Sequence, residues 1–446
     1  MNLLAPVDYN CAMNTHNYVN FFRQTSPYIH AHRGKTFVIA ISGESILAPN
    51  FHSMIHDIAL LQSLGMRVVL VHGARPQINE RLQLSGITPL FEQHIRVTDS
   101  DTMQCVKESV GCTRLIIETE LSMGLPNSPM HGSHIRVIGG NFITAKPVGI
   151  QEGIDFQRAG QIRRVDSEAI NYQLQSGALV LVSPIGFSPT GESFNLSYQD
   201  VATKIAIDLT AEKLILISQP SGVVDGDQLL KTLSLAQVAE LQETTKDPQQ
   251  AELLSAASVA CHEGVKRVHM VGYEEDGALL AELFTREGSG TLIMKDCEEV
   301  IRPATIEDVG GILNLISPLE ESGVLVKRSR ELLENEISRF SVVVHPEGLI
   351  IGCAALYPTT NKAAGELACV AIHEEFHGQG IGARLLEKVE YDSKATGISN
   401  LLAMTTKTAH WFIERGFIEV KVSDLPENKQ SMYNYRRNAR IFSKTL

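Results

Sequence analysis

The chain has 446 residues, of which 43% are hydrophobic and 20% charged, the profile of an ordinary folded protein. At about 150 residues per domain, this length predicts two or three domains that can bury a core without disulfides or metals. Lys+Arg 39 against Asp+Glu 51 leaves a net charge of −12, which disfavours nucleic acid as a partner, and no apolar run approaches the roughly 18 residues of a membrane span.

The amino terminus carries no targeting signal that we can read. Residues 1–20 lack both the basic region and the apolar core of a signal peptide, and residues 1–17 are expected to form a flexible extension. The seven cysteines are scattered, odd in number and without zinc-ligand spacing. We therefore expect a cytoplasmic location and no metal.

The first half alternates short β-branched runs with amphipathic stretches. Residues 36–41 and 67–71 predict strands, and residues 51–64 predict the helix between them. Such alternation is typical of βαβ units around a largely parallel sheet. The polar stretch 244–250 predicts a surface loop inside this domain. Further strands of the same kind are expected at 178–182, 214–217 and 265–271.

This half resembles the amino-acid kinases, most closely acetylglutamate kinase. The matching segments are 36–44, 71–78, 191–200, 211–216 and 282–291, which follow one another in the expected order. The positions that handle phosphate differ from the family pattern. Ala40 replaces the lysine of the first strand, residues 73–76 read Gly-Ala-Arg-Pro, and the second lysine has no counterpart between 250 and 264. Phosphoryl transfer depends on positioned positive charge, so no kinase activity is expected.

The pattern changes after residue 290, where a short charged bridge precedes a new unit. We expect a kinase-like domain over 18–294, a linker at 295–299 and a second domain over 300–446. The second domain reads as helix, helix, strand pair, strand, glycine-rich turn, helix, strand and helix. Residues 341–344 and 349–356 are a hairpin candidate. This order indicates a smaller α+β domain.

A glycine-rich turn between a strand and a helix is the most informative segment. The strand is expected at 366–372, and the helix that follows carries Ile381, Leu385, Leu386 and Val389 on one face. Glycines at such a turn leave backbone N–H groups uncovered at a helix N-terminus, where a pyrophosphate fits. A tight turn that holds no ligand is the alternative.

The turn sequence His-Gly-Gln-Gly-Ile-Gly at 377–382 resembles motif A of the Gcn5-related acetyltransferases (GNAT). The resemblance implies that acetyl-CoA lies along the preceding strand and the turn, with His377 in place of the usual basic residue. Near the carboxy terminus, Trp411 and Phe412 stand where many members carry an acidic tyrosine. The acetyl-CoA-binding residues implied by the resemblance are Cys369, Val370, Ala371, Ile372, His377, Gly378, Gln379, Gly380, Ile381 and Gly382.

Amine acetylation needs a base, an oxyanion donor and a partner for the leaving thiolate. The resemblance places Glu366 as a base that works through water, although a solvated strand-edge glutamate is the alternative. A backbone N–H near Cys369 or Val370 would hold the oxyanion, and the Cys369 side chain is equally compatible with core packing. Thr405, on the following strand, would donate a hydrogen bond to the thiolate.

Two basic groups are candidate carboxylate clamps, one at 327–330 and one at 436–437. Guanidinium groups bind carboxylates through two parallel hydrogen bonds, so an acceptor amine with two carboxylates would call for two such sites. Arg328 and Arg437 are the substrate-binding pair that we expect. A solvated basic cluster on an acidic chain is the alternative for each.

A kinase-like domain without kinase lysines, joined to an acetyltransferase domain, resembles the two-domain bacterial N-acetylglutamate synthases over about residues 18–443. The resemblance implies a parallel-sheet α/β sandwich followed by a smaller α+β domain. It also implies transfer of the acetyl group of acetyl-CoA to the α-amine of L-glutamate, the first step of arginine biosynthesis. Feedback inhibition by L-arginine and a homo-oligomer, a hexamer, are further implications.

The effector site implied by this resemblance lies in the first domain. A helix at 17–30 resembles the extra helix of arginine-sensitive kinases. Lys213 would meet the carboxylate of arginine and Glu282 its guanidinium, while Tyr28 with the backbone of Ser289 and Gly290 would close the pocket. An exposed lysine at a strand start and a solvated helix glutamate are the alternatives for Lys213 and Glu282.

Two other functions stay open. One is an active acetylglutamate-type kinase with an appended acetyl-CoA-binding domain, and the other is a non-catalytic protein that binds arginine.

Overall fold

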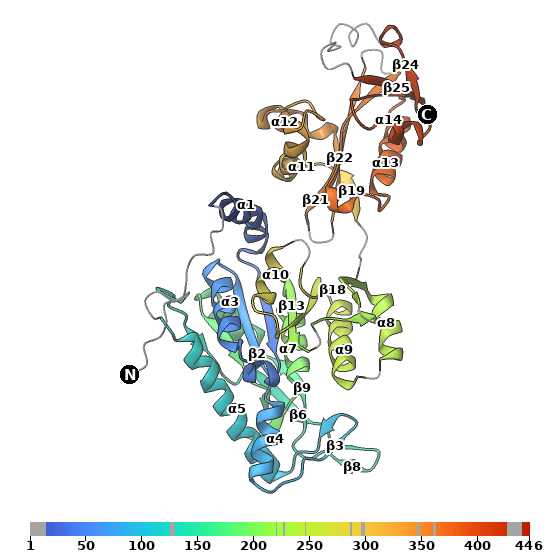
Figure 1. Ribbon diagram of the computed structural model, residues 1–446. Coiled ribbons are helices and arrows are strands. Elements are labelled where there is room, and N and C mark those ends of the chain that lie inside the picture. The colour runs from blue at the N-terminus through green and yellow to red at the C-terminus, as the bar shows by residue number, and fades with distance from the viewer. Residues whose placement is uncertain are drawn as a thin grey trace. The chain divides into compact units, whose positions relative to one another are not determined.

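A computed structural model describes residues 15–124, 130–219, 221–225, 228–245, 247–285, 288–295, 299–345, 348–359, 363–425 and 439–446. The chain forms two compact units, Met1–Asp296 and Cys297–Leu446. Figure 1 labels their elements along the chain.

The first unit is built on an eight-stranded sheet in its described part. Its strands are β1 (Thr36–Ile41), β2 (Arg67–His72), β5 (Val137–Ile138), β10 (Leu179–Val182), β13 (Lys213–Ser218), β16 (Thr232–Ser234), β17 (Arg267–Gly272) and β18 (Thr291–Met294). The order is β16-β18-β17-β13-β1-β2-β10-β5, and all neighbours are parallel except β17 and β18. The predicted parallel sheet is therefore confirmed.

Smaller sheets complete the first unit. A four-stranded sheet has the order β12-β11-β6-β9, and three two-stranded sheets, β3-β4, β7-β8 and β14-β15, accompany it. The strands of these sheets are β3 (Phe91–Glu92), β4 (Ile95–Arg96), β6 (Ile143–Pro147), β7 (Ile150–Gln151), β8 (Ile154–Asp155), β9 (Gly160–Val165), β11 (Ile185–Phe187), β12 (Ser193–Asn195), β14 (Val224–Asp225) and β15 (Gln228–Leu229).

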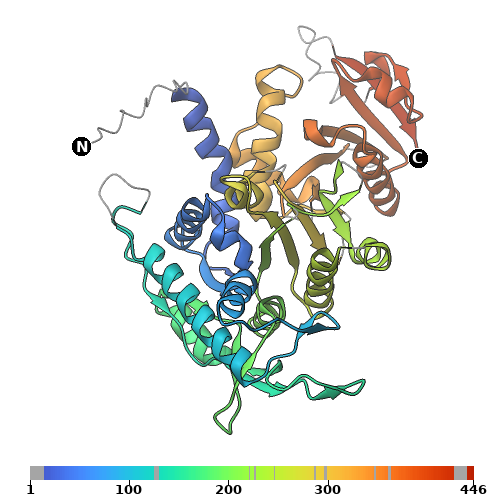
Figure 2. The same cartoon turned by 60° about the horizontal axis from the view of Figure 1, so that its bottom comes forward.

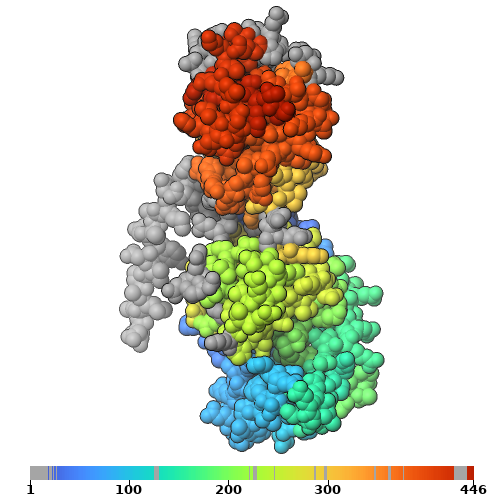
Figure 3. Space-filling view, turned by 90° about the vertical axis from the view of Figure 1, so that its right-hand side faces the viewer, coloured from blue at the N-terminus to red at the C-terminus, as the bar shows by residue number. Residues whose placement is uncertain are grey.

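Helices cover both faces of the large sheet (Figures 1 and 2). They are α1 (Thr15–His32), α2 (Gly43–Leu47), α3 (Phe51–Ser63), α4 (Arg75–Leu84), α5 (Ser100–Leu121), α6 (Ser167–Gln175), α7 (Tyr198–Asp208), α8 (Leu235–Thr244), α9 (Pro248–His262) and α10 (Ala278–Phe284). Phe37 and Ile39 of β1 belong to the core cluster shared with α3, α5 and α10, whereas Val38 belongs to the cluster shared with α6, α7 and α9. The face that carries α8 and α9 is seen in yellow-green in Figure 3.

The predicted loop at 244–250 is wrong over most of its length. Helix α8 ends at Thr244 and α9 begins at Pro248. Asp247 caps α9, because its Oδ1 accepts a hydrogen bond of 3.0 Å from the N–H of Gln249. Proline is well suited to a first helical turn, so these polar residues start a helix.

The second unit has a seven-stranded sheet in its described part. Its strands are β19 (Val300–Pro303), β20 (Phe340–Val344), β21 (Ile350–Pro358), β22 (Ala364–Ile372), β23 (Asn400–Thr405), β24 (Ile418–Val420) and β25 (Arg440–Thr445). The order is β19-β20-β21-β22-β23-β25-β24, and only the pairing of β22 with β23 is parallel among these strands. The predicted hairpin is confirmed as β20 and β21.

The helices of the second unit divide between the two faces of its sheet (Figure 1). They are α11 (Val309–Glu321), α12 (Arg330–Glu336), α13 (Ile381–Ala395) and α14 (Ala409–Ile413), with 3₁₀ turns at Ile306–Asp308, Ile337–Arg339, Glu374–Phe376 and Val422–Asp424. Helices α11 and α12 pack on one core cluster, α13 and α14 on the other. A parallel-sheet α/β domain followed by a smaller α+β domain is thus the fold, as predicted.

Membrane-spanning helices and metal-binding clusters are both absent among the described residues. None of the helices formed by these residues is both long and apolar enough to cross a bilayer. No group of three or more His, Cys, Asp or Glu side chains in the same residues could hold a metal ion.

Candidate functional site

Strand β22 is distorted in the middle of the second unit's sheet. Cys369 has a φ of +53°, a left-handed conformation that residues other than glycine rarely adopt. The register with β21 shifts here, since Cys353 pairs with Ala371 and Ala355 with Ala368. One extra residue on β22 is a β-bulge, and bulges re-aim side chains next to active sites.

Beyond the bulge, β22 separates from its other neighbour. The register pairs of β22 with β23 run from Ala364↔Asn400 to Leu367↔Ala403 and end there, although both described strands continue. The last five residues of β22 and the last two of β23 therefore leave the ladder between the two strands. Backbone N–H and C=O groups at such an opening are available to an extended ligand.

Glu366 lies on the face of the sheet that carries α11 and α12. It pairs directly with Tyr357 of β21, and residues opposite each other in an antiparallel pair point to the same face. Tyr357 packs in the core cluster shared with α11 and α12, and its hydroxyl donates to Glu336 Oε2 at 2.7 Å. Burial and Glu336 raise the pKa of Tyr357 to about 12, so this hydroxyl keeps its proton.

Arg328, in the loop between α11 and α12, lies beside the same face. Burial alone would lower its pKa, but Cys369 and Tyr357 nearby raise it. Its backbone N–H donates to Glu320 Oε1 at 2.9 Å and its Nη1 to the carbonyl of Val326 at 3.1 Å. Among the ion pairs of the described residues, none involves Arg328. The structure thus brings Arg328, Cys369 and Glu366 to one side of the sheet.

The thiols of Cys353 and Cys369 are buried beneath this face. Contact with Cys353 and the charge of Arg328 lower the pKa of Cys369, while contact with Cys369 and burial raise the pKa of Cys353. The side chains of Cys369 and Ala371 belong to the core cluster with α11, whereas Val370 and Ile372 pack toward α13. The side chain of Cys369 is thus a packing element, and its backbone shapes the strand.

The glycine-rich turn enters α13 through two left-handed residues, Gly378 at φ +82° and Gly380 at φ +77°. Gly380 caps the helix, and the N–H groups of Ile381 and Gly382 lie in its first turn, where intrahelical partners are missing. A Cβ at Gly382 would lie 3.2 Å from Trp411, so glycine permits the close approach of α14. The turn has the geometry of an anion-binding helix N-terminus.

His377 closes this turn onto the strand. Its Nε2 lies 2.9 Å from the carbonyl oxygen of Ile372, the last residue of β22. This contact closes the segment between residues 372 and 377. His377 therefore has a structural partner in addition to the phosphate-binding role expected from the sequence.

Thr405, at the end of β23, caps the turn into α14. Its Oγ1 accepts hydrogen bonds from the N–H groups of Lys407 at 3.3 Å and Thr408 at 3.0 Å. It also lies 2.8 Å from Thr408 Oγ1, and either hydroxyl can be the donor. The proton of Thr405 is available to another acceptor when Thr408 donates. Arg437, the expected partner of Arg328, lies outside the described residues.

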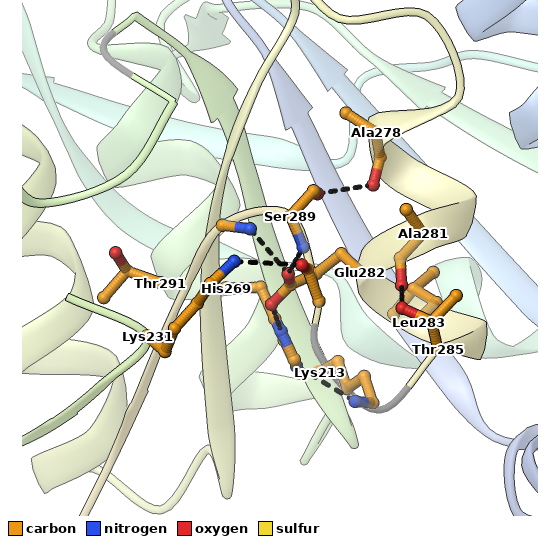
Figure 4. A network of polar contacts seen from close by, with 12 residues as sticks. Lys213, Lys231, His269, Ala278, Ala281, Glu282, Leu283, Thr285, Ser289 and Thr291 are labelled. Atoms are coloured by element: carbon orange, nitrogen blue, oxygen red, sulfur yellow. Dashed lines mark hydrogen bonds and ion pairs between the residues drawn. The ribbon is translucent and has the colours of Figure 1, made fainter. Parts of the chain in front are cut away.

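A second candidate site is a buried polar cluster in the first unit, formed by Lys213, His269 and Glu282 (Figure 4). Lys213 Nζ lies 2.9 Å from His269 Nε2, and His269 Nδ1 lies 2.6 Å from Glu282 Oε1. Lys213 is 2% exposed and Glu282 6%. The alternatives of an exposed lysine and a solvated glutamate are therefore both excluded.

The protonation of this cluster follows from its surroundings. Burial and the charge of Lys213 lower the pKa of His269 to about 4, so its ring is neutral. A neutral ring that accepts from Lys213 at Nε2 must donate its Nδ1 proton to Glu282. Burial opposes the charge of Glu282, but hydrogen bonds from His269, Gly290 and Ser289 lower its pKa to about 2.

The loop before β18 is hydrogen-bonded to the side chain of Glu282. The N–H groups of Ser289 and Gly290 each donate to Glu282 Oε2 at 2.8 Å, and Ser289 Oγ donates to the carbonyl of Ala278 at 2.7 Å. Gly288 has a φ of +59°, and a Cβ there would lie 2.6 Å from Glu282 Oε2. The structure thus brings together Lys213, Glu282, Ser289 and Gly290, four of the residues that the resemblance implied for the effector site.

Helix α1 reaches the same region. It spans Thr15–His32, two residues longer at each end than predicted. Tyr28 packs on the core cluster that includes Leu283 of α10, next to Glu282 in the sequence, and His32 Nε2 lies 3.2 Å from the Leu283 carbonyl. Sequence reasoning missed His269, whose signal was a histidine inside an otherwise apolar strand.

Two family models match the chain. The amino acid kinase family matches residues 35–272, and the acetyltransferase (GNAT) domain matches residues 337–419. Fold and site together define a two-domain N-acetyltransferase whose first domain has the kinase fold.

Curated relatives match almost the whole chain. An amino-acid acetyltransferase of Azotobacter vinelandii is 53% identical over 431 residues, which covers 96% of this chain and 100% of the relative. That of Pseudomonas fluorescens strain SBW25 is 52% identical and covers 96% and 99%. The chain belongs to the amino-acid acetyltransferase family and is an N-acetyltransferase.

Solved structures agree with this assignment. N-acetylglutamate synthase from Neisseria gonorrhoeae, complexed with coenzyme A and L-arginine, is 37% identical with a TM-score of 0.82, covering 96% of this chain and 99% of that one. The same enzyme complexed with coenzyme A and N-acetyl-glutamate is 38% identical with a TM-score of 0.61 and the same coverage.

Proposed function

We propose that this chain transfers the acetyl group of acetyl-CoA to the α-amine of L-glutamate. The donor is acetyl-CoA, because the second unit is a GNAT acetyltransferase domain. Glutamate as acceptor is supported by the 38% identical synthase, whose structure holds N-acetyl-glutamate and coenzyme A. The product would be the first intermediate of arginine biosynthesis.

The opening between β22 and β23 is the observation that carries this proposal. Their pairs end at Leu367↔Ala403, one residue after Glu366. The pantetheine arm would lie along the edge of β22 at 369–372, which has no register partner on β23, with the pyrophosphate at the N-terminus of α13. The thioester would then reach the opening from one face of the sheet. From the other face, Glu366 would meet the amine of the substrate and Arg328 one of its carboxylates.

Glu366 is the base in this mechanism. It takes the proton of the substrate ammonium through a water molecule, and the free amine attacks the carbonyl carbon of the thioester. A backbone N–H near Cys369 or Val370 stabilises the oxyanion. The C–S bond then breaks, the nitrogen gives its second proton to the leaving sulfur, and Thr405 donates a hydrogen bond to that sulfur as it leaves.

Arg328 and Arg437 bind the two carboxylates of glutamate. Arg328 is half-buried on the Glu366 side of the sheet, and a guanidinium in that position can meet a carboxylate through two hydrogen bonds. One clamp alone would accept many amino acids. The second clamp, at Arg437, is what selects the longer dicarboxylic acid.

Feedback by L-arginine would act on the cluster of Lys213, His269 and Glu282. The 37% identical synthase is complexed with L-arginine, which supports this regulation. An arginine guanidinium would replace the N–H groups of Ser289 and Gly290 as donors to Glu282, and Lys213 would turn to the effector carboxylate. Tyr28 would then close the pocket from α1.

The domains that we propose are 18–294 for regulation and 300–446 for acetyl transfer, joined by 295–299. A homo-oligomer, a hexamer by family resemblance, is further supported by Leu115 and Ile116 of α5, which are exposed apolar side chains. A cytoplasmic location suits the free thiols of the five described cysteines. We also keep the prediction that the first unit transfers no phosphate.

The proposal is tested by thiol release from acetyl-CoA with each common amino acid. L-glutamate should be the preferred acceptor, and Glu366→Gln should lower kcat about 100-fold because general bases contribute 10²–10⁴. The KM for acetyl-CoA should change less than about twofold, since the base does not bind the coenzyme. Glu387→Gln, an exposed carboxylate of α13, is the matched control. Wild-type turnover in Glu366→Gln would remove the residue from its role.

A further inference from the structure

Two thiols lie together beneath the bulge of β22, and the proposed function uses neither side chain. Cys353 of β21 and Cys369 of β22 come from neighbouring antiparallel strands (Figure 1). Both side chains belong to the core cluster with α11. Cys353 Sγ donates to the carbonyl oxygen of Cys369 at 3.5 Å, and neither sulfur is in a disulfide. The second unit thus holds a reduced pair of thiols at its most distorted strand.

The bulge accounts for this proximity. Cys353 pairs with Ala371 and Ala355 with Ala368, so residues 369 and 370 lie opposite the single residue 354. The extra residue adds the side chain of Cys369 to the face that already carries Cys353 and Ala371. Cysteines whose side chains point apart cannot be bridged, and a shared face of neighbouring strands removes that obstacle.

Cys369 is the more reactive of the two thiols. It is 5% exposed, whereas Cys353 is fully buried. Contact with Cys353 and the charge of Arg328 lower the pKa of Cys369 against the effect of burial, while contact with Cys369 and burial raise the pKa of Cys353. The thiolate is the form that attacks an oxidant. Cys369 would therefore react first, with Cys353 in place as the thiol that resolves its oxidised form.

The other three described cysteines have different surroundings. Cys105 and Cys261 are buried, and their sulfurs contact Ser85 Oγ and the carbonyl oxygen of Ile293, each at 3.6 Å. Cys112 is exposed on α5. An exposed thiol in the other unit is a suitable comparison for the pair.

We propose that Cys353 and Cys369 are an oxidation site that reacts with a peroxide and closes as a reversible disulfide between β21 and β22. The Cys369 thiolate attacks one oxygen of hydrogen peroxide and the O–O bond breaks. Cys369 becomes a sulfenic acid, and the hydroxide that leaves takes up the proton that the thiol had released. The Cys353 sulfur then attacks the Cys369 sulfur, the S–O bond breaks, and the leaving hydroxide takes the Cys353 proton. Two thiols are oxidised by two electrons, and the peroxide is reduced to two water molecules.

The disulfide would change the backbone at the proposed site of acetyl transfer. It removes the hydrogen bond from Cys353 to the Cys369 carbonyl and links the bulge covalently to β21. The N–H groups near Cys369 and Val370 are the proposed oxyanion donors. Removing one such donor costs about 10²–10³ in kcat, so displacing it should cost at least about tenfold. The oxidation itself does not rest on the proposed function, whereas this effect on turnover does.

Peptide mass spectrometry of the full chain tests the disulfide without an activity assay. The reduced protein is treated with hydrogen peroxide, the remaining thiols are blocked with N-ethylmaleimide, and trypsin is added without reductant. Cleavage after Lys362 separates the two cysteines into the peptides 340–362 and 363–384. These peptides should appear joined, at the sum of their masses less two hydrogens. Dithiothreitol should separate them, as it does other disulfides.

Thiol release from acetyl-CoA with L-glutamate is measured on the same samples after the peroxide has been removed. The kcat should fall in step with the appearance of the joined peptides and should return with dithiothreitol. Joined peptides with an unchanged kcat would overturn the effect on turnover. A reduced wild type that transfers no acetyl group to glutamate would overturn the proposed function alone, because the joined peptides are detected independently of it.

Two variants locate the reaction. Cys353→Ala removes the resolving thiol, so the joined peptides should be lost and the sulfenic acid of Cys369 should be trapped by dimedone on peptide 363–384. Cys112→Ser removes the exposed thiol of α5 and is the matched control, with the same joined peptides as the wild type. Absence of joined peptides in the oxidised wild type would overturn the proposal whether or not Cys353→Ala folds. Equal dimedone labelling of Cys369 in the wild type and Cys353→Ala would also overturn it.

Discussion

Polar groups are paired within the protein in the buried cluster of the first unit, whereas strand β22 of the second unit leaves part of its edge unpaired. In the cluster, Glu282 accepts hydrogen bonds from His269, Ser289 and Gly290, and its side chain is buried. At the opening, the backbone of β22 leaves its ladder and Glu366 is half-buried. A ligand at the opening would meet backbone groups that are already available. A ligand at the cluster would have to replace hydrogen bonds that Glu282 makes to the protein. A site that exchanges partners is suited to switching between states.

Removing the carboxylate of the cluster should have the largest effect on this contrast. Glu282→Ala leaves the N–H groups of Ser289 and Gly290 and the proton of His269 without an acceptor, beside the buried charge of Lys213. Breaking a buried charged network costs about 3–5 kcal/mol. We expect a loss of that size in the unfolding free energy of the first unit, measured by urea denaturation with far-UV circular dichroism.

Glu275→Ala is the matched control, because it removes an exposed carboxylate just before the same helix. It should leave the denaturation curve within about 0.5 kcal/mol of the wild type. An equal effect of the two substitutions would mean that the cluster contributes nothing particular to stability.

The pH dependence of stability should show the neutral state of His269. Its folded pKa of about 4 lies below the ordinary 6.5, so between these values the unfolded chain binds a proton that the folded chain does not. The unfolding free energy therefore falls as the pH falls from 6.5 to 4, by at most about 1.4 kcal/mol per pH unit for one group.

Substitution isolates this contribution, since His32 also has its pKa lowered, to about 3, and adds a slope of the same sign. His269→Gln cannot titrate and should flatten the slope by up to one proton per molecule. His262→Gln, at an exposed position of α9, should leave it unchanged. A slope that persists in full in His269→Gln would contradict a neutral, buried ring.

A smaller effect is expected at the opening, where Thr405 caps the turn into α14. Thr405→Val removes an acceptor for two N–H groups and should cost about 1 kcal/mol of unfolding free energy, as helix-cap losses do. Trp411 is the single tryptophan of the chain, so its fluorescence reports unfolding of the second unit. Thr405→Val should also lower kcat, since the hydrogen bond to the thiolate is lost. Thr405→Ser keeps the hydroxyl and should retain both the unfolding free energy and the kcat of the wild type. An unfolding free energy and a kcat equal to those of the wild type in Thr405→Val would contradict both the capping role and the catalytic role of the hydroxyl.

Residue patterns along the sequence predicted strands and helices, because the formation of these elements depends largely on residues that are close in sequence. The run 36–41 became β1 with the same bounds, since six consecutive apolar or β-branched residues suit a buried parallel strand. The bulge at Cys369 and the end of pairing at Leu367 could not be predicted. Both depend on which strands become neighbours, and nothing in the sequence of β22 alone records that.

Burial decided between the two interpretations of Lys213 and Glu282 that the sequence left open. Charged residues are usually exposed, so the sequence alone kept an exposed lysine and a solvated glutamate as alternatives. Here the neutral ring of His269 lies between them and makes their burial tolerable. Because the three residues come from different elements, their mutual satisfaction appears only after the sheet and α10 have packed.

The central claim is that the second unit performs acetyl transfer while the cluster of the first unit transmits the arginine signal. The most direct test is the arginine inhibition curve of thiol release in Glu282→Gln, with Glu275→Gln as control. The account predicts an uninhibited rate within about twofold of wild type and at least a tenfold higher arginine concentration for half-inhibition, as loss of about 1.4 kcal/mol of binding would give. An unshifted curve in Glu282→Gln would contradict it.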